Sequence, residues 1–278
     1  MSDFEIREYR PEDIPQLSAL WQETFGDSEH FVSEFFRMLP DMGTGLAAVS
    51  GDSVMGAAYV LTGQELVLNR LEHFTDEDCA PVIGYIYAVS VFPDFRNRGI
   101  GSALVKAAAE EAGKREADIV CTLPASESLY KWYGELIGVN CVLRRSSEII
   151  GSAPLEMYMP LSSAEYMLRR ENMLSGRPHL HLSAPSLEFE RILCAESGGG
   201  FYAAGCGIAA AYKENGRGVI TELICADENQ RERAAASIGD ALGVSEVELL
   251  SPSSGGSAYI AADSDKIVPD TVWNLSFD

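Results

Sequence analysis

The residue pattern best suited to chemistry lies at positions 96–102, where the sequence R-N-R-G-I-G-S joins an apolar strand to an amphipathic helix. A helix start presents unpaired backbone N–H groups and the positive end of the helix dipole. Gly99 and Gly101 remove Cβ atoms there, so an anion can approach the backbone closely. Arg96 and Arg98 add positive charge. The stretch therefore predicts a cradle for a diphosphate group.

This stretch differs from two other phosphate-binding motifs. The G-K-[ST] of a Walker loop does not follow it, and its glycines lack the G-x-G-x-x-G spacing of dinucleotide folds. The alternative interpretation is a glycine-containing helix start with two solvated arginines. The context favours an anion site, because the motif follows a strand and Pro93 and precedes a helix with Ile100, Leu104 and Val105 on one face.

The surrounding pattern alternates strands and helices. Pro11, Glu12 and Asp13 open a first helix that Gly26 ends, and a second helix follows Asp27 and Ser28. The order strand, two helices, three strands, helix, strand, helix and two strands predicts an α/β fold with a mixed sheet. The expected strands of this half are 4–10, 45–50, 54–66, 82–91, 118–123, 140–150 and 155–161.

Residues 3 to about 160 resemble the GCN5-related N-acetyltransferase (GNAT) superfamily. Motif A of that superfamily is a strand, then [QR]-x-x-G-x-[GA], then a helix, and R-N-R-G-I-G matches it at positions 96–101. Motif B resembles L-Y-x-x-x-G, and L-Y-K-W-Y-G matches it at positions 129–134. The resemblance implies a mixed central sheet flanked by helices and acetyl-CoA as co-substrate.

The resemblance also implies roles for individual residues. The CoA diphosphate would accept hydrogen bonds from the stretch Arg96, Asn97, Arg98, Gly99, Ile100, Gly101 and Ser102. Strand residues 88–91, with Val89 and Val91, would pair their backbone with the pantetheine arm, and a splayed gap after that strand would admit it. Val89 or its neighbour would donate an N–H to the thioester oxygen. Tyr130 would protonate the leaving thiolate, with Tyr133 as the alternative on the same helix face.

Three positions depart from the superfamily pattern. Leu123 and Glu135 stand where motif B often has Asn and Phe. The central strand I-G-Y-I-Y-A-V-S-V carries no glutamate that could act as general base. The amine proton would then pass to water or to a carboxylate from elsewhere, and the candidates are Glu23, Glu34, Glu72 and the loop T-D-E-D at 75–78.

The second half repeats much of the first half's order of strands and helices, which predicts an internal duplication. We expect a GNAT-like domain over 1–161, a helix and linker over 162–178, and a smaller, degenerate GNAT-like domain over 179–278. Alignment of the two strand–helix junctions places Arg233 at Gly99 and Glu232 at Arg98. The second copy is therefore expected to bind no CoA. The alternative is an unrelated α/β domain.

Composition excludes several other functions. The chain has 278 residues, 46% of them hydrophobic, and a formal net charge of −21, which repels nucleic acids and anionic membranes. No apolar run is long enough to span a bilayer and the N-terminus lacks a signal pattern, so we expect a cytoplasmic protein. The six cysteines are expected to be buried free thiols. The histidines His179 and His181 are expected on an exposed strand face, and no metal site is expected.

These observations predict an acetyl-CoA-dependent N-acetyltransferase that acts on a primary amine of a small molecule or peptide. The alternative is a non-catalytic acyl-CoA-binding regulatory or sensor protein, which the missing strand carboxylate favours. The acceptor and the oligomeric state are not specified by the sequence.

Overall fold

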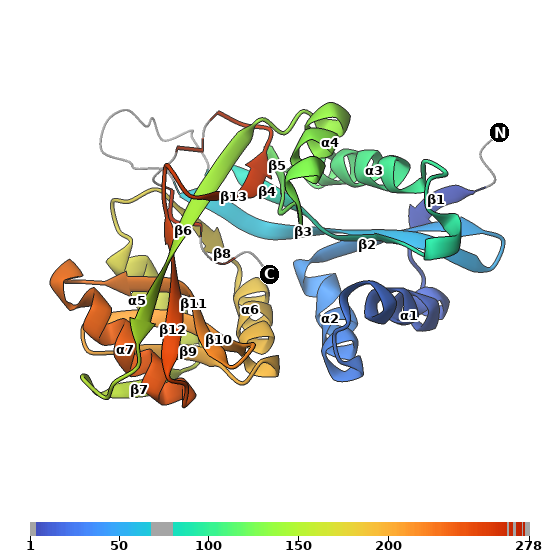
Figure 1. Ribbon diagram of the computed structural model, residues 1–278. Coiled ribbons are helices and arrows are strands. Elements are labelled where there is room, and N and C mark those ends of the chain that lie inside the picture. Colours follow the sequence, from blue (N-terminus) through green and yellow to red (C-terminus); the bar gives the residue numbers. More distant parts are fainter. Residues whose placement is uncertain (1–3, 68–79, 266, 269–270, 274, 276–278) are drawn as a thin grey trace. The chain divides into compact units, whose positions relative to one another are not determined.

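The computed structural model describes residues 4–67, 80–265, 267–268, 271–273 and 275. The chain divides into two compact units that interleave along the sequence (Figure 1). The first unit comprises residues 1–65, 81–142 and 259–267, and the second comprises 66–80, 143–258 and 268–278. A segment near the C-terminus thus belongs to the first unit. The predicted domain boundaries at residues 161 and 178 stay a prediction.

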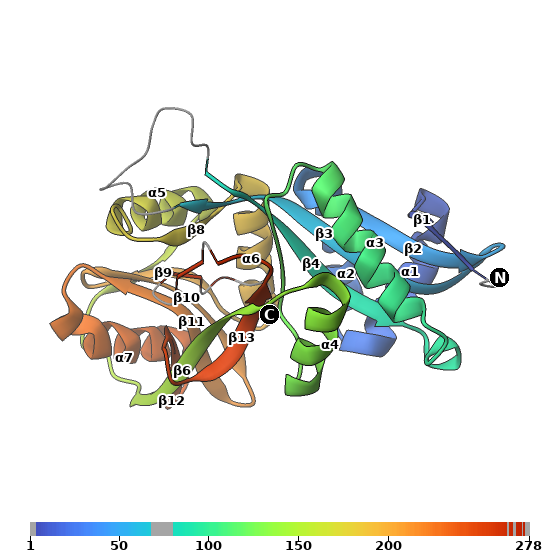
Figure 2. The same ribbon diagram turned by 90° about the horizontal axis from the view of Figure 1, so that it is seen from above.

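The first unit is a mixed sheet with the strand order β1-β2-β3-β4-β5-β13. β4 and β5 are parallel, and the other neighbours are antiparallel. Helices α1 and α2 cover one face of this sheet, and α3 and α4 cover the other (Figures 1 and 2). Its elements are β1 (Glu5–Glu8), α1 (Ile14–Phe25), α2 (Glu29–Met42), β2 (Gly43–Ser50), β3 (Ser53–Val67), β4 (Val82–Val91), α3 (Ile100–Lys114), β5 (Ile119–Thr122), α4 (Glu127–Ile137) and β13 (Ser257–Ala262).

Local signals in the sequence set the helix ends of the first unit. Gly26 ends α1 in the left-handed conformation, with φ at 81°. The Ser28 hydroxyl caps α2 by accepting a hydrogen bond from the Phe31 N–H at 3.0 Å. Both ends agree with the sequence prediction. Gly84 of β4 permits close approach of α3, because a Cβ there would lie 2.6 Å from the Ala112 Cβ.

The two faces of the first sheet have different cores. On the α1 and α2 side, rings of Trp21, Phe35 and Tyr59 pack together, with Trp21 and Phe35 centroids 4.5 Å apart. On the α3 side the core is mainly aliphatic, and it includes Val60, Ile86, Leu104, Val105 and Ala108. Burial of these apolar side chains fixes the helices on the sheet and so positions the β4–α3 junction.

The second unit is also a mixed sheet, with the order β6-β12-β11-β10-β9-β7. β11 and β12 are parallel, and α7 packs on an apolar cluster that includes Ile220, Ala235 and Ile238. Its elements are β6 (Cys141–Gly151), β7 (Tyr158–Leu161), α5 (Ser163–Met173), β8 (His179–Leu182), α6 (Ala184–Glu196), β9 (Gly200–Ala204), β10 (Gly207–Glu214), β11 (Arg217–Cys225), α7 (Arg231–Leu242) and β12 (Glu246–Pro252).

The second unit repeats the order of the first. The series β7-α5-α6-β9-β10-β11-α7-β12 corresponds to β1-α1-α2-β2-β3-β4-α3-β5, with β8 as an addition. This confirms the predicted second α/β domain with a GNAT-like order. The repeat starts at β7, however, not at the strand expected to open it near His179, because β7 pairs with β9 as β1 pairs with β2.

Each unit contains one strand that is distant in sequence from the strand with which it pairs. β13 pairs antiparallel with β5 in the first unit, through Ala261 and Ala262. β6 pairs antiparallel with β12 in the second unit, over residues 145–151 and 246–252. We expected β6 and β7 to end the first half, whereas both pair with strands of the second unit. Each parallel edge strand is therefore covered by a strand distant in sequence.

Candidate active site

The predicted phosphate cradle is a tight junction between β4 and α3. β4 ends at Val91, a short 3-10 turn follows at Pro93–Phe95, and α3 begins at Ile100. The first helical hydrogen bond runs from the Ala103 N–H to the Gly99 carbonyl at 3.0 Å. Backbone N–H groups of residues 97–102 therefore precede the helical ladder at the helix start. This is the geometry that an anion requires.

Two residues of the junction adopt left-handed backbone conformations. Asn97 has φ at 62°, and Gly99, which caps α3, has φ at 80°. A Cβ at Gly99 would have no atom within 4 Å, so the space in front of it is open. A Cβ at Gly101 would lie 3.8 Å from Val91 Cγ2 and 3.9 Å from the Trp132 ring, which are ordinary contacts. The protein itself would thus accept a small side chain at Gly101.

The two arginines of the junction are exposed and hold its loop. The Arg96 Nε donates to the Val91 carbonyl at 3.0 Å, and an Arg98 terminal nitrogen donates to the Asp94 carbonyl at 2.7 Å. The Arg98 guanidinium carbon also lies 5.4 Å from the centroid of the Phe95 ring. A guanidinium has five N–H donors. Each arginine can therefore brace the loop and still present donors to an anion.

β4 extends beyond its parallel partner. The pairing with β5 runs from Ile83 opposite Ile119 to Ile86 opposite Thr122, where β5 ends. The Thr122 hydroxyl donates to the Ile86 carbonyl at 3.0 Å at this last pair. Residues 87–91 of β4 continue without β5 beside them. The backbone of this segment is therefore available to an extended ligand on the β5 side.

A β-bulge lies in the same part of β4. Tyr87 pairs with Tyr59 and Ser90 with Ala57, so Ala58 faces both Ala88 and Val89. Ala88 has φ at 47°, which is costly for a residue with a Cβ. The extra residue turns the following side chains to the other face of the sheet.

The consequence of the bulge is visible in the packing. The Tyr87 ring lies 5.8 Å from Trp21, on the side of α1 and α2. Val89 and Val91 instead pack on the core under α3. A flat strand would place all three side chains on one face. The bulge thus sets Val89 beside the helix that bears the cradle.

The two motif B tyrosines have different surroundings on α4. Tyr133 is buried, and burial raises the pKa of its phenol, although a hydrogen bond with the Thr122 side chain lowers it. Tyr130 is half-buried and packs at the edge of the same core, with its hydroxyl oxygen shielded from solvent. Tyr133, the alternative candidate for the general acid, is therefore a buried side chain of the core.

The carboxylates that could act as general base differ in their surroundings. Glu23 is exposed on α1. Glu34 binds Arg37 with a shortest N–O distance of 2.6 Å, and this hydrogen bond lowers the pKa of its carboxyl group. A lowered pKa weakens a base. Glu72 and the loop at 75–78 lie outside the described residues.

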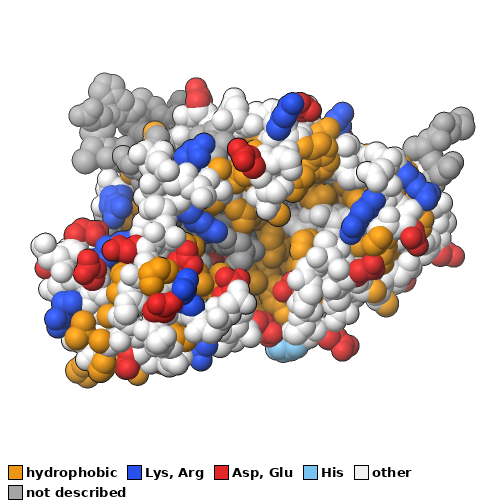
Figure 3. All heavy atoms as spheres, in the orientation of Figure 1, with side chains coloured by type: hydrophobic (Ala, Val, Ile, Leu, Met, Phe, Trp, Pro, Cys, Tyr) orange, Lys and Arg blue, Asp and Glu red, His pale blue; other side chains and the backbone are white. Residues whose placement is uncertain are grey.

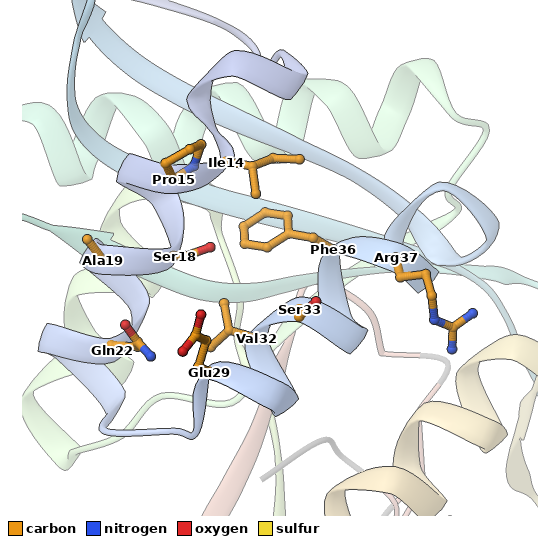
Figure 4. Close-up of a pocket in the computed structure, with 10 residues that line it drawn as sticks. All are labelled: Ile14, Pro15, Ser18, Ala19, Gln22, Glu29, Val32, Ser33, Phe36 and Arg37. Atoms are coloured by element: carbon orange, nitrogen blue, oxygen red, sulfur yellow. The ribbon is translucent and has the colours of Figure 1, made fainter.

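A groove between α1 and α2 was not predicted from the sequence. It has a volume of about 610 Å³, and the side chains of Gln22 and Glu29 lie near one another at one end, with Arg37 at the other (Figure 4). Phe36 and Val32 form part of its apolar lining. The helical periodicity of the two segments shows which residues face the core, but it does not show how far apart the helices lie.

In the second unit, a buried ion pair lies beside the strand end that corresponds to the bulge of β4. β11 has a bulge at Thr221, and its pairing with β12 ends at Ile220. The next residue, Glu222, is fully buried and accepts hydrogen bonds from Arg170 Nε at 2.8 Å and from the Tyr166 hydroxyl at 2.7 Å. A bulge and a strand end are thus retained, but charged side chains occupy the interior beside them.

The helix start of the second unit also differs from the cradle. α7 follows Gln230, which has φ at −101°, where α3 follows Gly99. Alignment of the helix starts therefore places Gln230 at Gly99 and Glu232 at Gly101, which corrects the predicted match of Arg233 with Gly99. Arg233 instead binds Glu156 at 2.7 Å. The glycine positions of the cradle are occupied by larger side chains under either alignment.

Two expectations about side-chain exposure were wrong in part. His179 is buried, and both His179 and His181 face the Glu171 carboxylate, at 3.1 Å each, so they do not lie on an exposed strand face. Cys121 and Cys194 are buried as expected, but Cys206 and Cys225 are half-buried. In the described part of the chain, no group of three or more His, Cys, Asp or Glu side chains could hold a metal ion.

The surface has mixed charge on the face shown in Figure 3, where acidic and basic side chains are interspersed. This distribution differs from the continuous basic surface of a nucleic-acid-binding protein. Among the described residues, no helix has both the length and the apolar character that a membrane crossing requires.

Comparison with known proteins identifies the first part of the chain. Residues 5–135 match the family model of the acetyltransferase (GNAT) domain. This range contains β1 to β5, the β4–α3 junction and most of α4. The chain therefore contains a GNAT acetyltransferase domain. No curated protein matches the chain in sequence.

Solved structures resemble almost the whole chain. A conserved protein of unknown function from Enterococcus faecalis V583, called a probable N-acyltransferase, is 14% identical with a TM-score of 0.69, and the match covers 93% of this chain and 72% of that one. A GCN5-related N-acetyltransferase from Kribbella flavida is 17% identical with a TM-score of 0.68, and the match covers 95% of this chain and 73% of that one. One from Anabaena variabilis is 13% identical with a TM-score of 0.66, and the match covers 93% of this chain and 72% of that one. At such identities the likeness concerns the fold.

Proposed function

We propose that the protein transfers an acetyl group from acetyl-CoA to a primary amine of a small molecule or peptide. The observation that carries this proposal is the continuity of two features on one strand. On its β5 side, β4 is unpaired at residues 87–91, and the short turn after it leads to the open helix start at Gly99. An extended ligand with a diphosphate at one end fits this arrangement.

In this proposal the cradle holds the CoA diphosphate. Backbone N–H groups between Arg96 and Ser102 donate to its oxygens, and the two arginines add charge. The open space at Gly99 and the absence of a side chain at Gly101 support this assignment. The pantetheine amides would pair with the β4 backbone at Val89 and Val91. The residues present thus fit the co-substrate that the family implies.

The acyl transfer then follows from groups near the bulge. The neutral amine nitrogen attacks the thioester carbonyl, and the C–N bond forms as the C–S bond breaks. The Val89 N–H would stabilise the negative charge that develops on the carbonyl oxygen. Tyr130 would give its phenol proton to the departing sulfur, because α4 carries it to the edge of the core that contains Val89. Water or a carboxylate takes the proton from the amine.

The acceptor would approach from the α1 and α2 side of β4. Tyr87 is half-buried there, directly before the bulge, and its ring contacts Trp21 and Tyr85 with centroids 5.8 and 5.9 Å apart. Aromatic faces attract ammonium groups, and the net charge of −21 also favours a cationic acceptor. These features support an enzyme that acts on a cationic amine.

An assay of thiol release from acetyl-CoA tests this function. Polyamines, aminoglycosides, amino acids and peptides form the acceptor panel, and mass spectrometry identifies the acetylated product. Release that depends on one class of amine supports the enzyme. If acetyl-CoA binds with ordinary affinity and no amine stimulates release, the sensor function is correct instead. The absence of a carboxylate on β4 is the observation that favours that second function.

A further inference from the structure

Two cysteines of the second unit lie side by side where β9, β10 and β11 meet. Cys206 belongs to the two-residue turn between β9 and β10, and Gly205 before it has φ at 54°. Gly207 pairs with Cys225 at the end of β11, and the Ala226 N–H donates to the Cys206 carbonyl at 3.2 Å. Cys206, in the turn, is therefore next along the chain to the residue that faces Cys225.

Gly207 allows the two thiols to meet. A Cβ at this position would lie 2.7 Å from the Cys225 sulfur, so a side chain there would displace that thiol. The Cys225 side chain thus lies over the Gly207 backbone, next to Cys206, and the two thiols are within hydrogen-bond reach. Neighbouring positions in adjacent strands have the Cα separation that a disulfide requires.

The pair differs from Cys121 and Cys194 in its access to solvent. Cys206 and Cys225 are half-buried, whereas Cys121 and Cys194 are fully buried. Small oxidants reach the first two thiols more readily. Burial and the adjacent Cys206 raise the pKa of Cys225 to about 11. The raised pKa disfavours the Cys225 thiolate, and Cys206 lies in a turn whereas Cys225 ends a strand, so the first attack on an oxidant is assigned to Cys206.

We propose that Cys206 and Cys225 form an oxidisable dithiol that closes to an intramolecular disulfide on reaction with a peroxide. The Cys206 sulfur attacks one peroxide oxygen and becomes a sulfenic acid, and the other oxygen leaves as water. The Cys225 sulfur then attacks the Cys206 sulfur, the S–S bond forms, and the second oxygen leaves as water. The two thiols lose two hydrogens and two electrons, and one peroxide is reduced to two water molecules.

This modification site is separate from the proposed acetyl transfer. It lies at the end of β11 before α7, in the unit whose helix start lacks the glycines of the cradle. The bond would tie the β9–β10 turn to β11, so it constrains the unfolded chain over residues 206–225. Oxidation is therefore expected to raise the melting temperature of the folded protein.

Treatment of the full chain with hydrogen peroxide, followed by alkylation and tryptic digestion without reductant, tests the proposal. Cleavage after Lys213, Arg217 and Arg231 separates the two cysteines, so the disulfide joins peptides 192–213 and 218–231. Fragmentation of the joined peptides distinguishes Cys206 from Cys194. We expect this linkage in most of the monomeric protein, with its mass restored by reductant and a higher melting temperature before reduction.

Single variants assign the two roles. Cys225→Ser should leave a Cys206 sulfenic acid that dimedone traps, and Cys206→Ser should leave Cys225 largely unreacted under the same treatment. Circular dichroism establishes that each variant is folded. The proposal is overturned if folded wild-type protein gives no 206–225 linkage, if Cys121 or Cys194 reacts as fast, or if the disulfide joins two chains.

Discussion

The substitution Gly101→Glu should abolish acetyl-CoA binding and leave the fold intact. Gly101 lies in the first turn of α3, where a Cβ makes contacts of 3.8 Å or more with Val91 and Trp132. The fold therefore accepts the new side chain. Glutamate also has a better helix propensity than glycine by about 0.5–1 kcal/mol, and a negative charge suits a helix start. The melting temperature should stay the same or rise.

The effect on binding follows from the groups that the new carboxylate displaces. Each hydrogen bond to a charged group contributes about 1.5–3 kcal/mol, and the carboxylate blocks about two such bonds at the diphosphate. The loss of about 3–6 kcal/mol corresponds to affinity weaker by a factor of about 10²–10⁴. Like-charge repulsion increases the loss further.

Gly113→Glu is the matched control for this experiment. Gly113 lies near the other end of the same helix, it is exposed, and a Cβ there meets no atom within 4 Å. The control therefore has the same change in charge and helix propensity far from the cradle. Titration calorimetry should give wild-type affinity for Gly113→Glu and one acetyl-CoA per chain. Equal affinity of the two variants would refute the cradle, and two acetyl-CoA per chain would refute the degenerate second copy.

Further predictions concern the catalytic tyrosine, the helix cap, the buried ion pair and acid stability. Tyr130→Phe should reduce kcat by about 10²–10⁴-fold at unchanged acetyl-CoA affinity; full activity, or the same loss in Tyr133→Phe alone, contradicts the assignment. Gly99→Ala should lower the free energy of unfolding by about 1–2 kcal/mol in denaturant titration, because φ at 80° disfavours a Cβ; unchanged stability would show that this conformation is not required. Glu222→Gln should destabilise the fold by about 3–5 kcal/mol, since it removes the fully buried carboxylate partner of Arg170 and leaves only the more exposed Glu171 at 3.4 Å; a small change would mean that the buried ion pair is dispensable. Arg7, 2.6 Å from Asp13, lowers the pKa of that carboxyl group. Its stabilising effect is therefore present above the ordinary aspartate pKa near 4 and lost as pH falls through the lower folded value. Asp13→Asn should flatten this part of the stability profile, and a profile identical to wild type would contradict that cause.

The sequence was sufficient to predict the order of elements from β1 to α4 in the first unit and the strand–helix junction at which the cradle is proposed. Short-range signals carry that information: Gly26 and Ser28 at helix ends, and Gly99 at a position that needs a positive φ. The duplicated second domain followed from the repeated order of elements. The family match over residues 5–135 agrees with the motif-based prediction.

Other features depend on long-range packing, which residue patterns do not show. β13 pairs with β5, from which it is separated by more than a hundred residues, and it was not predicted at all. The bulge at Ala88 has no local signal, because alanine does not favour a positive φ. The proximity of Cys206 to Cys225 likewise depends on the register of β10 and β11. The start of α7 was misaligned for a related reason, since helix caps differ between the two copies.

Amide hydrogen exchange with and without acetyl-CoA tests the central claim most directly. Bound acetyl-CoA should slow exchange of the backbone amides at 97–102, which precede the helical ladder of α3, and at 87–91 on the open edge of β4. Amides at the start of α7, at 229–233, should be unaffected. Protection at α7, or binding without protection at 97–102, would show that the β4–α3 junction is not the acetyl-CoA site.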